Sequence, residues 1–196
     1  MTRTFNTRMV FRTMGALLLI EAVFMTLALG VSLWYGEADS GIFLLSTIIT
    51  LLAGVIGLMV GRRAESRMGE REGYVIVAMV WVVFSAFGLL PYYLSGQVNS
   101  ITDAWFESMS GFTTTGATII PDLNVITHGL LFWRSLTQWI GGMGIIILSL
   151  AIIPMVSDGS MSLLAAEITG PTKEKVHAKV AQTAKAIWGI YVALSL

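Results

Sequence analysis

The sequence predicts an all-α integral membrane protein, and three observations carry this prediction. Of its 196 residues, 55% are hydrophobic and only 12% are charged, which is about half the charged fraction of an average soluble domain. Several apolar segments reach about 20 residues, the length that a helix needs to cross a bilayer. Between two of them lies the run TTTGAT, residues 113–118. Because unpaired backbone groups are costly in hydrocarbon, an irregular run of this kind must be buried in protein or line a wet cavity.

Four segments have the length and composition of membrane-spanning helices, and a fifth begins near the end of the chain. The four cover residues 14–35, 42–60, 73–94 and 129–154. The fifth begins near residue 184 and has about 13 residues before the chain stops, whereas a span needs about 20. We therefore expect the chain to be a piece of a longer protein.

The placement of basic residues orients these spans. Eleven of the 12 Lys and Arg residues lie before the first span, between the second and third, or after the fourth: Arg3, Arg8, Arg12, Arg62, Arg63, Arg67, Arg71, Lys173, Lys175, Lys179 and Lys185. The opposite loops contain no Lys or Arg and carry Glu37, Asp39, Asp103 and Asp122. The positive-inside rule assigns the basic side, and with it the N-terminus, to the cytoplasm.

Composition excludes several function classes. A net charge of zero gives no basic surface for nucleic acid. The absence of cysteine excludes a disulfide framework, a thiolate nucleophile and a zinc–sulfur site. The sequence offers neither paired aspartates nor a Ser/His pair at membrane depth, so we expect no enzyme.

The connection between the third and fourth spans, residues 95–128, is too apolar for a solvated loop. Ser100 and Asp103 match a helix capping box, so we expect a short helix over about residues 101–112, ended by Gly111, followed by the threonine run at 113–118. A short helix that dips into the membrane, an extended return and a full span form the membrane–pore–membrane unit of cation channels.

The threonine run supplies the oxygens that such a unit needs. An ion without water costs tens of kcal/mol in hydrocarbon, and rings of backbone carbonyls replace the hydration shell of potassium in channels. Consecutive carbonyls come from Thr113, Thr114, Thr115, Gly116 and Ala117. The glycine permits backbone angles that other residues adopt at a cost. The preceding helix directs its negative C-terminal end toward the run, which favours a cation.

Two charged residues in apolar surroundings stand beside this unit. Arg134 is the one basic residue outside the cytoplasmic loops, and an intramembrane charge suggests a function by default. Three roles remain open for it: snorkelling outward, taking part in conduction, or pairing with Glu107 on the short helix and bracing the threonine run. We favour the brace.

Other intramembrane residues favour structural roles. Glu21 lies in the first span, away from the pore unit, and we expect a buried hydrogen-bonded acid or a tilt-exposed one rather than an ion relay. Gly54, Gly57 and Gly61 share one helix face and match a close-packing motif. His128 has no metal-ligand spacing, and we expect it to be an isolated surface residue.

Two blocks of sequence carry a resemblance to a known family. The block DAWFESMSGFTTTGATII, followed by FWRSLTQWIGGMGIIILSLAIIP, resembles the Trk/Ktr potassium-transporter family in its bacterial Trk-type branch. The later stretch GPTKEKVHAKVAQTAKAIWGIYVALS is similar to the cytoplasmic linker of that family and the start of its next repeat. The first two spans are similar to the extra N-terminal helix pair of this branch.

The resemblance implies a division of the chain and a set of partners. The expected parts are an N-terminal transmembrane pair with its cytoplasmic loop (1–72), a first membrane–pore–membrane repeat (73–154), a cytoplasmic linker (155–183) and the start of a second repeat (184–196). The family builds one pseudo-fourfold, potassium-channel-like pore from four such repeats in one polypeptide of the bacterial inner membrane. It is usually dimeric and carries a cytoplasmic nucleotide-binding regulator.

The resemblance also implies the transported ion and its site. By position, the filter of the first repeat falls on Thr113–Ala117, with Gly116 as the filter glycine and Gly111, Glu107 and Arg134 as its support. In plant relatives a serine at that glycine accompanies sodium transport, so Gly116 favours K⁺. With one repeat of four present, this segment alone should not form the family's pore.

Two other readings remain open at this stage. One is a channel in which four copies of a single-repeat chain each donate one unit. The other is a non-conducting membrane scaffold or regulatory subunit that carries the loop without passing ions.

Overall fold

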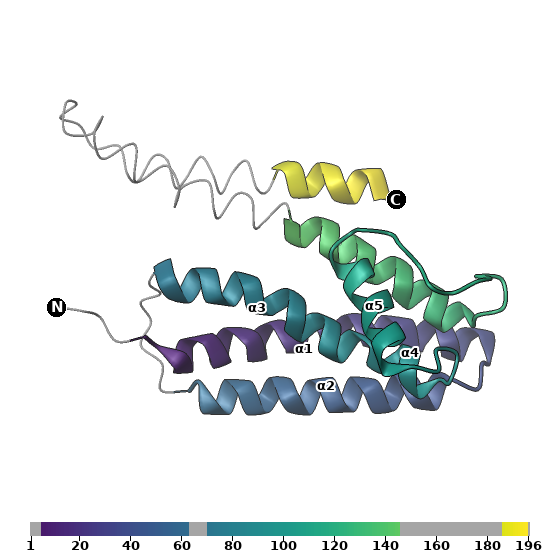
Figure 1. Cartoon of the computed structure of the whole chain (residues 1–196), viewed down its shortest axis with the longest axis horizontal. Helices are drawn as coiled ribbons and strands as arrows, with labels where there is room; N and C mark the ends of the chain where they lie inside the picture. The colour runs from purple at the N-terminus through teal and green to yellow at the C-terminus, as the bar shows by residue number, and fades with distance from the viewer. Residues whose placement is uncertain (1–4, 63–69, 146–185, 196) are drawn as a thin grey trace. The chain divides into compact units, whose positions relative to one another are not determined.

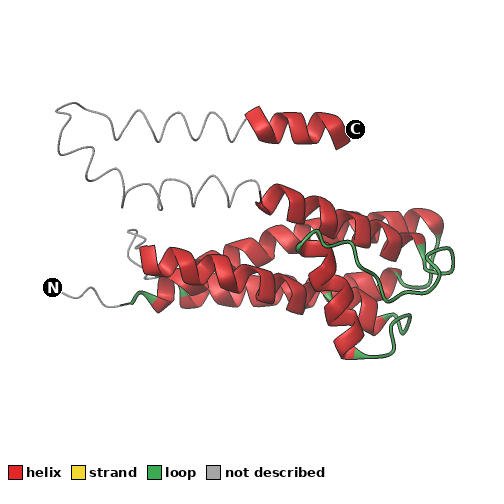
Figure 2. Cartoon of the chain, turned by 45° about the horizontal axis from the view of Figure 1, so that its top comes forward, coloured by secondary structure: helices red, strands yellow, loops and turns green. Residues whose placement is uncertain are grey.

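The computed structural model describes residues 5–62, 70–145 and 186–195, and these residues contain helices and loops but no strand (Figure 2). Its labelled elements are α1 (Thr7–Tyr35), α2 (Ser40–Val60), α3 (Glu70–Gly88), α4 (Leu90–Leu94) and α5 (Ile101–Phe112) (Figure 1). Further helices cover 128–145 and 186–195. The expected end of the fourth span and the expected linker, 146–183, lie outside the described residues. The chain divides into two compact units, Met1–Ile140 and Gly141–Leu196.

Three helical segments of the first unit are long and apolar enough to cross a membrane: α1, α2 and the pair α3–α4. They agree with the first three expected spans. Helix α1 begins at Thr7, seven residues before the apolar run, because the Asn6 side chain accepts a hydrogen bond from the backbone N–H of Met9 at 3.1 Å. Because a capped helix starts at its cap, α1 begins on the N-terminal side of the apolar stretch.

Glycines bring α1 and α2 into backbone contact. A Cβ on Gly57 would lie 2.8 Å from Cα of Gly15, and one on Gly61 would lie 2.4 Å from the Cβ of Arg12. A Cβ on Gly54 would meet the Leu19 side chain at 2.8 Å. Small residues on one face let membrane helices approach closely. The predicted packing role of Gly54, Gly57 and Gly61 is therefore confirmed.

The third span bends near its outer end. Helix α3 ends at Gly88, and α4 begins at Leu90 with Pro91 in its first turn. Proline removes a backbone donor and its ring crowds the preceding turn, so it is favoured at a helix start and interrupts a helix interior. The break leaves the Gly88 carbonyl free to accept a hydrogen bond from Trp133 Nε1 at 3.0 Å.

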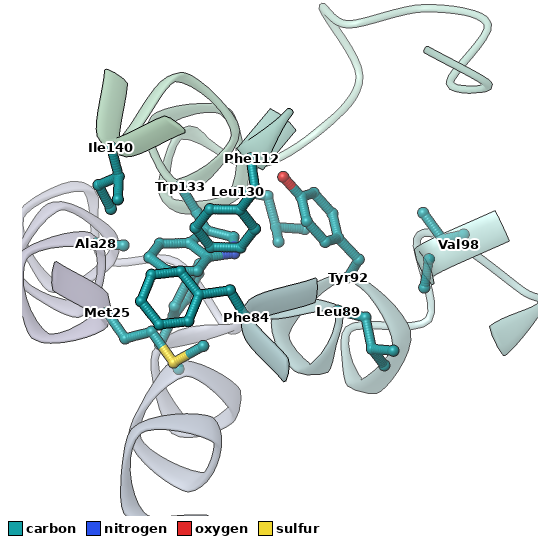
Figure 3. Close-up of a cluster of buried hydrophobic side chains, with 12 residues drawn as sticks. Met25, Ala28, Phe84, Leu89, Tyr92, Val98, Phe112, Leu130, Trp133 and Ile140 are labelled. Carbon is teal, nitrogen blue, oxygen red and sulfur yellow. The ribbon is translucent and has the colours of Figure 1, made fainter. Parts of the chain in front are cut away.

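An aromatic core joins α3 and α5 to helix 128–145 (Figure 3). The rings of Phe84 and Phe112 lie 5.3 Å apart, and Phe112 meets Trp133 edge-to-face at 6.3 Å. Phe112 and Trp133 are fully buried. Such ring pairs contribute about 0.5–1.5 kcal/mol beyond the area they bury. This core fixes the end of α5 from which the threonine run departs.

The close contact of α1 and α2 gives a direct test. In Gly15→Ala the new methyl group would lie 2.6 Å from Gly54 O and Leu58 N, both backbone atoms that have little room to move. We expect this variant to lose about 1–3 kcal/mol of stability through overpacking. Thermal unfolding of the purified full-length protein in detergent measures the loss.

Gly30→Ala is the matched control, because nothing lies within 4 Å of the Cβ that it adds to the same helix. Its unfolding midpoint should stay at or above that of the wild type, since alanine favours helix over glycine. Equal midpoints for the two variants would contradict the packing.

Candidate functional site

The site begins at the C-terminal end of α5. The predicted helix over about 101–112 agrees with α5, Ile101–Phe112, but Gly111 is not the residue that ends it, because Gly111 lies inside the last turn and Thr113 is the C-cap residue. Gly111 has a packing role instead: a Cβ there would lie 2.3 Å from Oγ1 of Thr137. At the other end, Ser100 is the N-cap residue, but its hydroxyl contacts Thr102 Oγ1 at 2.5 Å and forms no capping bond.

The amide groups of the threonine run turn back onto α5. Thr113 N–H donates to Met109 O and Thr114 N–H to Gly111 O, both at 2.9 Å. The N–H groups of Thr115 and Gly116 both donate to Ser110 O, at 3.0 and 3.4 Å. The last carbonyls of a helix normally lack partners. Here the N–H groups of four consecutive residues of the run are the partners of these carbonyls.

Two residues of the run have a left-handed backbone conformation. Thr114 has φ +57° and Gly116 has φ +75°, both left-handed. For Thr114 this conformation costs about 1–2 kcal/mol, whereas glycine adopts it freely. The structure thus holds Thr114 in a strained conformation two residues before the glycine that the sequence singled out.

This geometry leaves the carbonyl oxygens of the run available. Within the described residues, no hydrogen bond ends on the carbonyls of Thr113 to Gly116. The Ala117 carbonyl differs, because it accepts a hydrogen bond from Ser110 Oγ at 2.6 Å. Residues 114–119 are exposed in this chain. Four of the five predicted carbonyls are therefore unpaired, three of them on exposed residues and that of Thr113 on a half-buried one, and the fifth keeps one lone pair.

Glu107 ties the far end of the run to helix 128–145. Its carboxylate accepts a hydrogen bond from Arg134 Nε at 2.8 Å and from Thr118 Oγ1 at 3.0 Å. It also accepts from Ile119 N–H at 3.2 Å. The Glu107 side chain is 1% exposed and that of Arg134 is 15% exposed. The structure therefore brings together the two charges that the sequence suggested as a pair.

Sequence reasoning missed three polar residues that support the run. Thr118 bonds to Glu107 and Ser110 bonds to Ala117, as described above. The side-chain amide of Gln138 lies 3.1 Å from the position of a Cβ on Gly116. Gln138 follows Arg134 by four residues, so helical spacing places both on one face. That spacing is the signal that could have found it.

The structure corrects two expectations about Glu21. The residue is 1% exposed, so it is not tilted toward solvent. Neither carboxylate oxygen has a hydrogen-bond partner in the described part of the chain. It also does not lie away from the pore unit: Glu21 Oε1 and Ser108 Oγ lie 3.3 and 2.6 Å from the position of a Cβ on Gly88. The expectation failed because no local pattern encodes how α1 packs on α3 and α5.

Comparisons with known proteins show the family of the chain. The model of the TrkH family, described as a cation transport protein, matches residues 29–196. The chain belongs to the TrkH family. The all-α integral membrane fold follows from the membership and from the apolar helices.

Relatives within the TrkH family extend over almost the whole chain. The Trk system potassium uptake protein TrkH of Vibrio parahaemolyticus is 39% identical over 96% of this chain and 39% of its own length. TrkH of Escherichia coli K12 is 39% identical over 96% of the chain and 40% of its own length, and TrkG of the same organism is 30% identical over 98% and 40%.

A solved structure of the TrkH family gives the same fold. The crystal structure of the potassium transporter TrkH from Vibrio parahaemolyticus superposes with a TM-score of 0.80 at 35% identity, over 97% of this chain and 38% of that one. The chain therefore spans about two fifths of the length of these relatives.

The Glu107–Arg134 pair gives a stability prediction. In Glu107→Gln the guanidinium of Arg134, 15% exposed, loses its counter-charge. Removing one partner of a buried ion pair costs about 3–5 kcal/mol. We expect a loss of this size in the free energy of unfolding of the full-length protein in denaturant.

The double variant Glu107→Gln/Arg134→Met is the control, because it removes the stranded charge as well. It should recover part of the loss. A double variant as unstable as the sum of the two single variants would show that the pair contributes no coupling energy.

Proposed function

We propose that this chain is the first pore-forming repeat, with its N-terminal helix pair, of a channel-like subunit that takes up potassium across the bacterial cytoplasmic membrane. The observation that carries the proposal is the set of unpaired carbonyls from Thr113 to Gly116 in one irregular segment that is exposed from Thr114 onward. Support also comes from the relatives, which are Trk system potassium uptake proteins.

The chemistry of the run suits a dehydrated monovalent cation. Because the amide groups of the run are bonded to α5, its backbone dipoles point their oxygens outward. Carbonyl oxygens replace the hydration shell of potassium without a fixed negative charge, so the ion can leave as well as enter. The Ala117 carbonyl oxygen, which accepts one hydrogen bond from Ser110, can contribute its second lone pair to the same row of oxygens. Glu107, Arg134 and Gly111 hold the run in shape and do not touch the ion.

The membrane potential supplies the driving force. Moving one charge through 100 mV is worth about 2.3 kcal/mol, and each 1.4 kcal/mol is a factor of ten, so the potential alone sustains roughly fifty-fold accumulation. No coupled ion is needed for uptake of that size.

The remaining parts of the proposal concern the complete protein. Residues 73–154 form one repeat of a pore that needs three more, and the N-terminus lies in the cytoplasm, as the eleven basic residues indicate. The Trk-type resemblance supports a homodimer and a cytoplasmic nucleotide-binding regulatory subunit. The chain itself requires no organic cofactor for this task.

The filter glycine gives a selectivity prediction. In Gly116→Ser the new side chain meets a backbone at φ +75° and the Gln138 amide at 3.1 Å. The left-handed conformation costs a non-glycine residue about 1–2 kcal/mol, so the carbonyls should shift. We expect the preference for potassium over sodium to fall by about five- to thirtyfold, measured as ⁸⁶Rb⁺ uptake by the full-length protein in competition with Na⁺.

Gly96→Ser is the matched control. Gly96 has φ +69° with nothing within 4 Å of an added Cβ, so the substitution imposes the same backbone strain outside the threonine run. Its selectivity should equal that of the wild type. Wild-type selectivity in Gly116→Ser would overturn the assignment of the filter.

Growth of a potassium-uptake-deficient bacterium on limiting potassium tests the function as a whole. The full-length gene should restore growth, whereas a scaffold that does not conduct would leave the cells dependent on high external potassium.

A further inference from the structure

The loop between α1 and α2 reaches the beginning of helix 128–145. Glu37 accepts backbone hydrogen bonds from His128 N–H at 2.7 Å and from Gly129 N–H at 2.9 Å. The same carboxylate lies 2.8 Å from His128 Nδ1. His128 lies at the surface, as the sequence suggested, but it is not isolated. The contact joins Glu37 to residues that lie 91 and 92 positions later in the sequence.

A second carboxylate strengthens this contact. Asp39 is 5% exposed and accepts hydrogen bonds from the hydroxyls of Ser32 and Thr127. A Cβ on Gly129 would lie 2.9 Å from both Phe43 and Ser32, so the backbone of the helix start is pressed against the N-terminal pair.

An aromatic stack covers the outside of the contact. The ring of Tyr35 stacks on that of His128 with centroids 4.0 Å apart and an interplanar angle of 1°. We call Glu37, Asp39, Ser32, Thr127 and His128 the outer clamp.

The physical effect of the outer clamp is that of a helix cap supplied by a distant segment. The first N–H groups of a helix lack internal partners, and the helix dipole places about half a positive charge there. Glu37 satisfies two of these groups with a negative charge.

Helix 128–145 also carries three residues that support the threonine run: Arg134, Thr137 and Gln138. Arg134 follows His128 by six residues, about 9 Å along the axis at 1.5 Å per residue. Thr137 packs on Gly111 and Gln138 on Gly116, one turn further. A shift of the helix along its axis would move all three contacts at once.

We propose that Glu37 and Asp39 are positioning residues: through the outer clamp they set the axial position of helix 128–145, and with it the shape of the ion filter. The inference rests on the proposed function. It assigns the N-terminal helix pair, which lies outside the pore repeat, a part in selectivity. The two acids do not touch the ion.

The protonation of Glu37 offers a readout. Burial alone would raise the pKa of Glu37, but hydrogen bonds from the Gly129 and His128 backbones and the His128 side chain lower it below 4.5. A lowered pKa means that the stabilisation by Glu37 is present above about pH 4.5 and is lost as the pH falls through the lowered value. Asp39, His128 and Tyr35 are the titratable groups around it.

The test compares Glu37→Gln with Asp122→Asn in the full-length protein reconstituted in vesicles. Both variants remove one acid from the loops on the side of the membrane opposite the basic residues. Asp122, however, is exposed and bonds only to Asn124 within the described residues. We expect Glu37→Gln to lower the preference for ⁸⁶Rb⁺ over Na⁺ by about three- to tenfold per folded molecule. The preference of Asp122→Asn should stay within twofold of the wild type.

Two further measurements keep the test decisive if Glu37→Gln folds poorly. Thr127→Val removes one clamp hydroxyl with little change in volume, and it should lower the preference in the same direction by a smaller factor. Hydrogen exchange should report faster exchange of the Thr113–Gly116 amides in both clamp variants and no change in Asp122→Asn.

The wild type should also lose selectivity as external pH falls through the lowered pKa of Glu37, and Glu37→Gln should lack that step. Unchanged selectivity and unchanged exchange in the clamp variants would overturn the inference. Absence of ⁸⁶Rb⁺ uptake by the wild type would overturn the proposed function instead, and the exchange measurement would still decide the clamp.

Discussion

The structure of the site depends on hydrogen bonds between the last turn of α5 and the amide groups that follow it. Each amide from Thr113 to Gly116 donates to a carbonyl of that turn. A helix end buried without partners for its carbonyls is unstable, and an irregular segment in a membrane is unstable with unpaired donors. One set of bonds meets both demands, and the carbonyls of the run are then the groups left to interact with something else.

This arrangement requires that the run be held at both ends. At its start, α5 is fixed by the aromatic core of Phe84, Phe112 and Trp133. At its far end, Glu107 binds Thr118 and Ile119 while Arg134 neutralises its charge. Gly111 and Gly116 lie where this segment contacts helix 128–145. The role of Gly111 is therefore contact with Thr137 rather than helix termination. Close packing and polar pairing therefore act together to hold a backbone that is strained at Thr114.

Much of this could be predicted from the sequence, for physical reasons that the residues make clear. The spans follow from length and hydropathy, and the Glu107–Arg134 pair follows because two opposite charges in apolar surroundings need each other. The range of α5 agrees with the prediction, but the role of Gly111 does not: a glycine near a helix end favours termination, whereas this one lies in the last turn and packs against Thr137. The surroundings of Glu21 and the Glu37–His128 contact were out of reach. They depend on how distant helices pack, and no local spacing records that.

The central claim is that the carbonyls of Thr113 to Gly116 face a potassium pathway, and anomalous scattering tests it most directly. Crystals of the full-length protein grown with Tl⁺ or Rb⁺ in place of K⁺ should show an anomalous peak in coordination contact with two or more of these oxygens. Peaks confined to other parts of the protein, with these four carbonyls bonded to protein or lying against lipid, would contradict the account.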